Sequence, residues 1–153
     1  MRDISRRTFC AATILAGASS LLGRNNAAAQ ELPRGVTEIP LSKVKWVLGS
    51  NGLESAMLFG DSTKAGPYLN LVKWPPNKKL SAHKHPDDRH GIVISGVHYM
   101  GYGEKFDEKK VQAHKAGTYF SEPANTPHFG MTKGKGAVLY FYVIGPSGSI
   151  PLE

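Results

Sequence analysis

The histidines are the residues of this chain whose type and spacing are best suited to chemistry. All six lie between positions 83 and 128 of the 153 residues. His83 and His85 are two residues apart, so in a β-strand both side chains project from one face, about 6.5 Å apart at a rise of about 3.3 Å per residue. Two imidazoles in this arrangement can share one metal ion, and a third ligand from elsewhere in the chain is needed to complete a site.

The sequence that follows this pair resembles the first motif of the cupin superfamily. In that motif, His-x-His is followed by a glutamate and then by a glycine. Here His83-Lys84-His85 is followed, after three residues, by Arg89 and, after six more, by Gly96. The spacing matches without a gap, and Arg89 stands where the family pattern has its glutamate.

A second stretch resembles the second cupin motif. Gly117 is followed after five residues by Pro123, after one more by Asn125 and after two more by His128. The spacing again matches without a gap, with Asn125 where the pattern usually has glycine. We therefore identify the chain as similar to the small single-domain cupins, which have an RmlC-like jelly roll.

This resemblance implies an all-β fold: a single small antiparallel β-barrel of jelly-roll type, open at one end. It implies that His83, His85 and His128 converge on a divalent metal ion inside the barrel. The residues support this, because Asn125-Thr126-Pro127 is a turn sequence that can direct His128 back across the sheet. Three neutral imidazoles suit Zn, Fe, Mn, Ni or Cu, and spacing does not choose among these metals.

The fourth ligand of the family pattern is the glutamate that Arg89 replaces, and a guanidinium cannot coordinate a metal. Two candidates for the fourth ligand are His90, if the preceding turn shifts the strand register by one residue, and Asp88 or its neighbour Asp87. Arg89 beside the metal is then expected to bind a substrate carboxylate. A barrel that has lost its metal is the alternative.

The remaining histidines have less defined roles. His98 follows Gly96 in a strand pattern and shares a face with Met100 and Tyr102, so it is a candidate substrate-binding residue in the barrel, or a structural histidine in the core. His114 lies in a polar stretch and is expected at the surface.

The elements that must position these residues read as short β-strands separated by turns. The strand-like runs end in Gly, Pro, Asn and Asp clusters, and this pattern is typical of an antiparallel sandwich or barrel. They are 44–48, 56–59, 68–74, 92–95, 97–102, 118–121 and 137–144, and the only helical candidate is 104–110.

The first 29 residues have the pattern of a secretory leader, with a basic start, an apolar stretch from Cys10 to Leu22 and Ala27-Ala28-Ala29 as a cleavage site. Ser5-Arg6-Arg7-Thr8-Phe9 resembles the twin-arginine signal, which exports folded proteins, so we expect a periplasmic or secreted protein. The domain organisation expected is signal peptide 1–29, extended arm 30–42, cupin barrel 43–147 and tail 148–153.

The composition excludes several classes of protein. With 41% hydrophobic and 20% charged residues the chain is not disordered, and 17 Gly and 10 Pro argue against a helical bundle. The single Cys lies in the predicted leader, so the mature chain has neither disulfides nor thiol chemistry. The net charge of +7 is scattered, so we expect no nucleic-acid partner, and no membrane association of the mature form.

Two classes of function remain. The first is a metal-dependent enzyme acting on a small organic molecule, for which a carboxylate-bearing compound is the candidate, with the oxygenase, isomerase and lyase classes not distinguished. The second is a non-catalytic periplasmic binding or sensing protein that uses the barrel as a pocket for a small molecule, with or without a metal. The resemblance also suggests a homodimer formed through sheet edges.

Overall fold

The computed structural model describes residues 33–152, and in them the chain is all-β, as the sequence predicts. The helical candidate 104–110 contains a single 3-10 turn. The predicted leader, 1–29, with its twin-arginine sequence, lies outside the described residues. In chain order the elements are η1 (Leu41–Lys43), β1 (Val47–Leu48), β2 (Glu54–Phe59), β3 (Gly66–Trp74), β4 (Lys79–Lys84), β5 (Arg89–Tyr102), η2 (Glu108–Lys110), β6 (Gln112–Lys115), β7 (Tyr119–Glu122), β8 (His128–Met131), β9 (Ala137–Gly145) and β10 (Ile150–Pro151).

The chain divides into two units between Glu38 and Ile39, and the second unit contains every strand of residues 33–152. The described part of the first unit, 33–38, is exposed. In the second unit, part of the expected arm forms η1, and β10 lies in the expected tail, where it pairs with β4. The two 3-10 turns of residues 33–152 are far shorter than a membrane-spanning helix.

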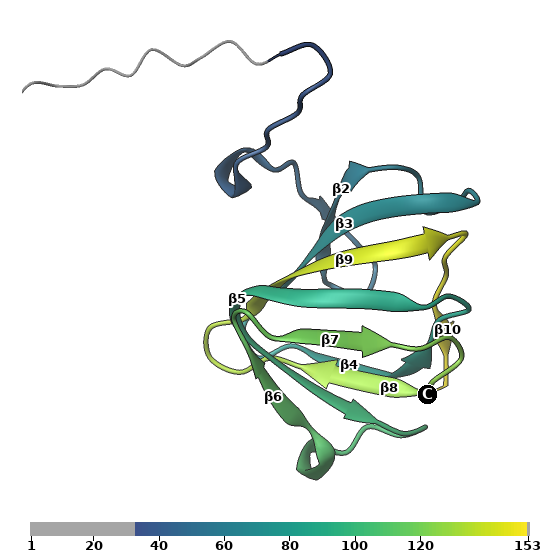
Figure 1. Ribbon diagram of the computed structural model, residues 1–153. Coiled ribbons are helices and arrows are strands. Elements are labelled where there is room, and N and C mark those ends of the chain that lie inside the picture. The colour runs from purple at the N-terminus through teal and green to yellow at the C-terminus, as the bar shows by residue number, and fades with distance from the viewer. Residues whose placement is uncertain (1–32, 153) are drawn as a thin grey trace, which may run out of the picture. The chain divides into compact units, whose positions relative to one another are not determined.

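The long strand β5 belongs to two antiparallel sheets and connects them (Figure 1). Its first half pairs with β9 and β7, in a sheet that continues from β9 through β3 and β2 to β1. Its second half pairs with β6 and β8, in a sheet that continues from β8 through β4 to β10. The candidate metal ligands therefore come from the second sheet and from the place where it meets the first sheet.

The core follows from the alternation of side chains along the strands. In β9, Ala137, Leu139, Phe141 and Val143 are buried, whereas the residues between them are more exposed. Because β9 pairs with both β3 and β5, these side chains meet inward-facing residues on two neighbouring strands. The same alternation decides which residues of β5 and β7 face the interior.

One difference between the strands and the predicted runs lies at Gly96. The sequence suggests a break at Gly96, but β5 is continuous from Arg89 to Tyr102. The register shifts between Val93 and Ser95, and Gly96 has a φ of +76°. A side-chain Cβ at Gly96 would lie 2.1 Å from the Gly136 carbonyl oxygen, so glycine allows the strand to cross between the two sheets at this point.

Candidate metal centre

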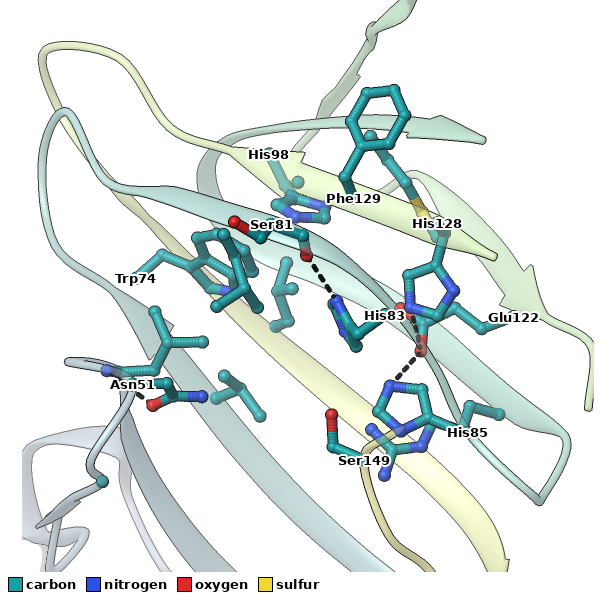
Figure 2. A pocket seen from close by; sticks show the side chains of 18 of the residues that line it. Asn51, Trp74, Ser81, His83, His85, His98, Glu122, His128, Phe129 and Ser149 are labelled. Atoms are coloured by element: carbon teal, nitrogen blue, oxygen red, sulfur yellow. Dashed lines mark hydrogen bonds and ion pairs between the residues drawn. The ribbon is translucent and has the colours of Figure 1, made fainter. Parts of the chain in front are cut away.

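Three histidines from two adjacent strand ends meet on the inner wall of the barrel (Figure 2). His83, near the end of β4, is the direct cross-strand partner of His128, the first residue of β8, and His85 follows β4 by one residue. The centroid of the His83 ring lies 4.5 Å from that of the His128 ring and 5.0 Å from that of the His85 ring. One ring nitrogen from each of the three lies within 4.8 Å of those of the other two.

Each of these rings is fixed through its Nδ1 atom. A backbone carbonyl only accepts hydrogen bonds, so the Nδ1 atom that contacts it must carry the proton. The carbonyl is that of Ser81 for His83, of Gly148 for His85 and of Thr126 for His128. In the neutral rings the lone pair is therefore on Nε2, the atom through which a metal would be bound, and the carbonyls supply the outer contacts that orient ligand histidines.

The three imidazoles are also held in the neutral form. Burial lowers the pKa of His83 and His128 below their usual value, and it lowers the pKa of His85 to about 3 with a further contribution from the nearby positive charge of Arg89. His85 and His128 are 5% and 3% exposed. At neutral pH the Nε2 lone pairs are thus available to a metal without the loss of a proton.

A carboxylate that the sequence analysis does not identify lies beside the histidines. Glu122, the last residue of β7, is 5% exposed, and its Oε2 atom lies 3.7 Å from Nε2 of His85 and 3.6 Å from Nε2 of His128. Burial raises the pKa of Glu122 to about 7, although the positive charge of Arg89 acts in the opposite direction. The signal that could have found it is its position two residues after Phe120, on the same strand face.

Arg89 points into the barrel but does not lie free beside the histidines. Its Nε donates to Oδ2 of Asp87 at 3.1 Å and its Nη2 donates to Oγ of Ser147 at 2.6 Å. The Ser147 hydroxyl in turn donates to the same Asp87 oxygen at 3.0 Å. The Arg89 side chain is 19% exposed and lines the central cavity, so it can still meet a ligand.

The two candidates for a fourth ligand are not brought to the cluster. His90 faces outward and is exposed, and its Nδ1 lies 2.9 Å from the hydroxyl of Tyr119. Asp88 is also exposed, and its Oδ1 accepts a hydrogen bond from the backbone N–H of Ala124 at 2.7 Å. The register of β5 against β9 keeps strict alternation at its start, so Arg89 is the inward residue and His90 the outward one.

The histidines open onto a cavity of about 600 Å³. Trp74 and His98 line this cavity away from the three clustered histidines (Figure 2). Asn51 and Ser149 also line the cavity. The apolar side chains of the wall are Leu53, Val72, Leu80, Ala82, Met100, Phe129, Leu139 and Phe141. A cavity of this size is suited to a small organic molecule.

His98 is the most unusual polar residue of this wall. It is 2% exposed, and neither ring nitrogen has a hydrogen-bond partner; the indole N–H of Trp74, whose ring lies 4.8 Å away, has none either. Burial is the main cause that lowers the pKa of His98 to about 3, with His114 contributing. Unpaired buried nitrogens of this kind are uncommon in folded proteins.

His114 differs from the surface position expected for it. It lies on β6 opposite His98 and is only partly exposed, and its ring packs 5.4 Å from that of Phe120 and 6.4 Å from that of His98. The polar residues around it in the sequence, which suggested a surface site, are the outward-facing residues of the same strand.

The donor set fits a divalent transition metal. Three neutral imidazole nitrogens converge, and Nε2 of His128 and Oε2 of Glu122 are buried without a hydrogen-bond partner, although such atoms are normally paired. A metal ion at the point where they converge would satisfy both. Nitrogen-rich sites of this kind suit zinc, iron, nickel or copper, and the geometry of the protein atoms does not select one.

Comparisons with known proteins agree with this architecture. The family described as ChrR Cupin-like domain matches residues 36–148. The structure is similar to the polyketide cyclase RemF from Streptomyces resistomycificus, with a TM-score of 0.65 and 14% identity over 77% of this chain and 86% of that one. It is also similar to an RmlC-like cupin from Shewanella frigidimarina, with a TM-score of 0.56 and 14% identity over 69% of this chain and 87% of that one.

A third similar structure is the DMSP lyase DddQ from Ruegeria pomeroyi, with a TM-score of 0.58 and 14% identity over 72% of this chain and 61% of that one. No curated protein matches the chain in sequence. At these identities the structural likeness establishes the fold, and the jelly-roll prediction is confirmed.

Proposed function

The chain belongs to the ChrR cupin-like domain family, and from this membership we propose that it is a metal-binding cupin that acts as a metal-dependent enzyme on a small organic molecule bearing a carboxylate. The observation that carries the proposal is the convergence of three histidine rings, each fixed through Nδ1 by a backbone carbonyl, on the wall of a cavity of about 600 Å³.

The charges around the cavity support an anionic substrate. Asp87 and Arg89 form an ion pair, so they add little net charge together. A divalent ion held by three neutral histidines and the Glu122 carboxylate together carry a net charge of +1. Because this charge is buried, leaving it unbalanced costs free energy. A ligand carrying a single negative charge would balance it, and the Arg89 guanidinium offers the planar donors that suit a carboxylate.

The residues of the chain would then have separate roles in binding the metal and the substrate. His83, His85 and His128 hold the metal, which when bound supplies Lewis-acid polarisation of a substrate oxygen. Arg89, fixed by Asp87 and Ser147, binds and orients the substrate carboxylate. The apolar residues of the wall lower the polarity around the site, which strengthens these electrostatic interactions.

His98 and Trp74 would contact the substrate at a distance from the metal. Both residues line the same cavity and their buried ring nitrogens have no partner, so a substrate with a polar group in addition to its carboxylate would satisfy them if these rings turn toward it. Two of the similar structures are named as a cyclase and a lyase, and for this chain we leave the oxygenase, isomerase and lyase classes undistinguished.

Elemental analysis of the protein purified from its native host, together with mass spectrometry of extracted small molecules, tests this proposal. We expect about one transition-metal ion per chain and turnover of a small carboxylic acid that is lost when the metal is removed by a chelator. A tightly held metabolite, with no metal and no turnover, would contradict the proposal and favour a non-catalytic binding or sensing protein.

One observation favours this second function. The motif position that carries an acidic residue in the family pattern carries Arg89, which is already bound by Asp87 and Ser147. A fixed guanidinium facing a cavity is a common arrangement for holding an anion without reacting with it. Turnover therefore discriminates between the two functions better than ligand affinity.

We also propose that the protein is exported through the twin-arginine route to the periplasm or the outside of the cell. The support is the sequence Ser5-Arg6-Arg7-Thr8-Phe9 before an apolar stretch and Ala27-Ala28-Ala29. Changing Arg6 and Arg7 together to Lys should abolish export while preserving charge, and the intact mass of the native exported protein should correspond to cleavage after Ala29. An exported protein that retains Cys10 would contradict the predicted cleavage.

A further inference from the structure

Glu122 and Arg89 face one another across two paired strands. Their Cα atoms are register partners in the β5–β7 ladder, and both side chains point inward. We propose that Glu122 is the fourth protein ligand of the metal, so that the carboxylate is supplied from β7 and not from the β5 position that Arg89 occupies. This inference rests on the proposed metal site and adds a ligand from a position that the second sequence motif leaves unspecified.

The backbone geometry makes such an exchange feasible. Residues directly opposite one another in an antiparallel pair have Cα atoms only about 4.5–5.5 Å apart and side chains on the same face. The family pattern has its carboxylate at the position of Arg89. A carboxylate at the position of Glu122 lies on the neighbouring strand and faces the same side of the sheet. The contacts of its Oε2 with Nε2 of His85 and His128, at 3.7 and 3.6 Å, show that it reaches two of the three histidines.

The chemistry of the facing atoms suits a cation between them. In the tautomer set by the Nδ1 contacts, the Nε2 atoms of His85 and His128 are lone-pair acceptors, and an ionised carboxylate oxygen is also an acceptor. Oε2 of Glu122 and Nε2 of His128 are buried and have no hydrogen-bond partner. A cation placed between them satisfies both groups at once.

The separations suit ligands of one ion. With metal–nitrogen and metal–oxygen bonds of about 2.0–2.2 Å, two adjacent ligand atoms are about 2.8–3.6 Å apart in geometries from octahedral to tetrahedral, and the octahedral ones leave positions open for a substrate. The distances from Glu122 to the two Nε2 atoms, 3.6 and 3.7 Å, are close to this range.

Arg89 does not compete for this carboxylate. Its Nε and Nη2 donate to Asp87 and Ser147, and within residues 33–152 the structure has no hydrogen bond or ion pair between Arg89 and Glu122. Asp87 therefore neutralises the guanidinium and leaves Glu122 to the histidines. This division explains why the barrel contains two buried acids, each with a different partner.

Competition titrations of Zn²⁺ and Co²⁺ against a chelator, on the full mature chain stripped of metal, test the inference. Glu122→Gln keeps the size of the side chain and removes the anionic ligand, so we expect its affinity for both ions to fall at least about tenfold. The visible absorption of the Co²⁺ form should also change, because a ligand to the ion changes. Asp88→Asn, which removes an exposed carboxylate from the nearby turn, should change affinity by less than about threefold.

His128→Ala separates this inference from the proposed function. If His128→Ala loses the metal while Glu122→Gln retains native affinity and the native Co²⁺ spectrum, the fourth-ligand assignment is overturned and the three-histidine site stands. If His128→Ala also keeps native affinity, the proposed metal site itself is wrong. Should Glu122→Gln fail to fold, a crystal structure of the zinc-loaded native chain decides: a Glu122 oxygen at about 2.0–2.2 Å from the ion supports the assignment, and one beyond bonding distance overturns it.

Discussion

Arg89 and Asp87 form an ion pair in the barrel wall, with side chains that are 19% and 4% exposed. Removing one partner of such a pair leaves the other charge buried without compensation. We predict that Arg89→Gln lowers the free energy of unfolding of the metal-free protein by about 3 kcal/mol, as measured by urea denaturation. The cost comes from the Asp87 carboxylate that remains.

The double variant Arg89→Gln with Asp87→Asn is the control for this prediction. Because it removes both charges and keeps side chains of similar size, it should recover most of the lost stability. Equal stability of Arg89→Gln and the native protein would show that Asp87 is stabilised by solvent and that the pair does not fix the guanidinium.

At the scale of single residues, the sequence predicts the three clustered histidines but not their carboxylate neighbour. His83, His85 and His128 could be chosen because their spacing matches two motifs, and the structure brings them together. Glu122 was missed because the predicted strand ended at Ser121, so alternation was not extended to it. The pairing of Asp87 with Arg89 depends on the turn between β4 and β5, whose side-chain contacts no local pattern specifies.

The C-terminal strand β10 and the residues before it help to orient the side chains of His85 and Arg89. It pairs with β4 beside His83, and the residues before it supply the Gly148 carbonyl that accepts from His85 and the Ser147 hydroxyl that accepts from Arg89. We predict that truncation after Pro146 weakens zinc affinity by about tenfold or more, because His85 loses the contact that orients its ring. A chelator competition titration measures the change.

Truncation after Ser149 is the matched variant for this experiment. It removes β10 but keeps Gly148 and Ser147, so it separates strand pairing from the hydrogen bonds to His85 and Arg89. We expect its zinc affinity to be closer to that of the native chain than to that of the shorter truncation. Equal losses in the two variants would assign the effect to β10 alone.

At the scale of elements, strands with clear alternation and β-branched or aromatic residues were predictable, as β3 and β9 show. β4, β6 and β8 were not, because their polar, histidine-containing or glycine-containing sequences have weak intrinsic strand preference. They are strands because neighbouring strands complete their hydrogen bonds, and this pairing is a property of the whole sheet.

Buried histidines should make the free energy of unfolding of the whole barrel depend on pH. For His98 the direction of this dependence follows from its pKa. Its ordinary pKa of 6.5 is lowered by burial to about 3. Between these values the unfolded chain binds a proton that the folded chain does not, so the free energy of unfolding falls as pH decreases from 6.5 toward 3. We predict that His98→Gln reduces this pH dependence by up to about 1.4 kcal/mol per pH unit below pH 6.

Urea denaturation of the metal-free proteins at pH 7 and pH 5 measures this dependence. The comparison concerns the difference between the two pH values, so a uniform loss of stability in His98→Gln does not affect it. His90→Gln, in which an exposed histidine is replaced, should retain the native difference. An unchanged difference in His98→Gln would show that His98 is solvated or protonated in the folded barrel.

In the proposed function, His83, His85 and His128 together hold one divalent ion inside the barrel. The most direct test is metal content by mass spectrometry of the native protein and of His83→Ala, His85→Ala and His128→Ala, each purified in the same way, with His98→Ala and His114→Ala as controls. We predict about one ion per chain in the native protein and both controls, and at least about tenfold less in each of the three variants. Equal metal content in all five variants and the native protein would contradict the site.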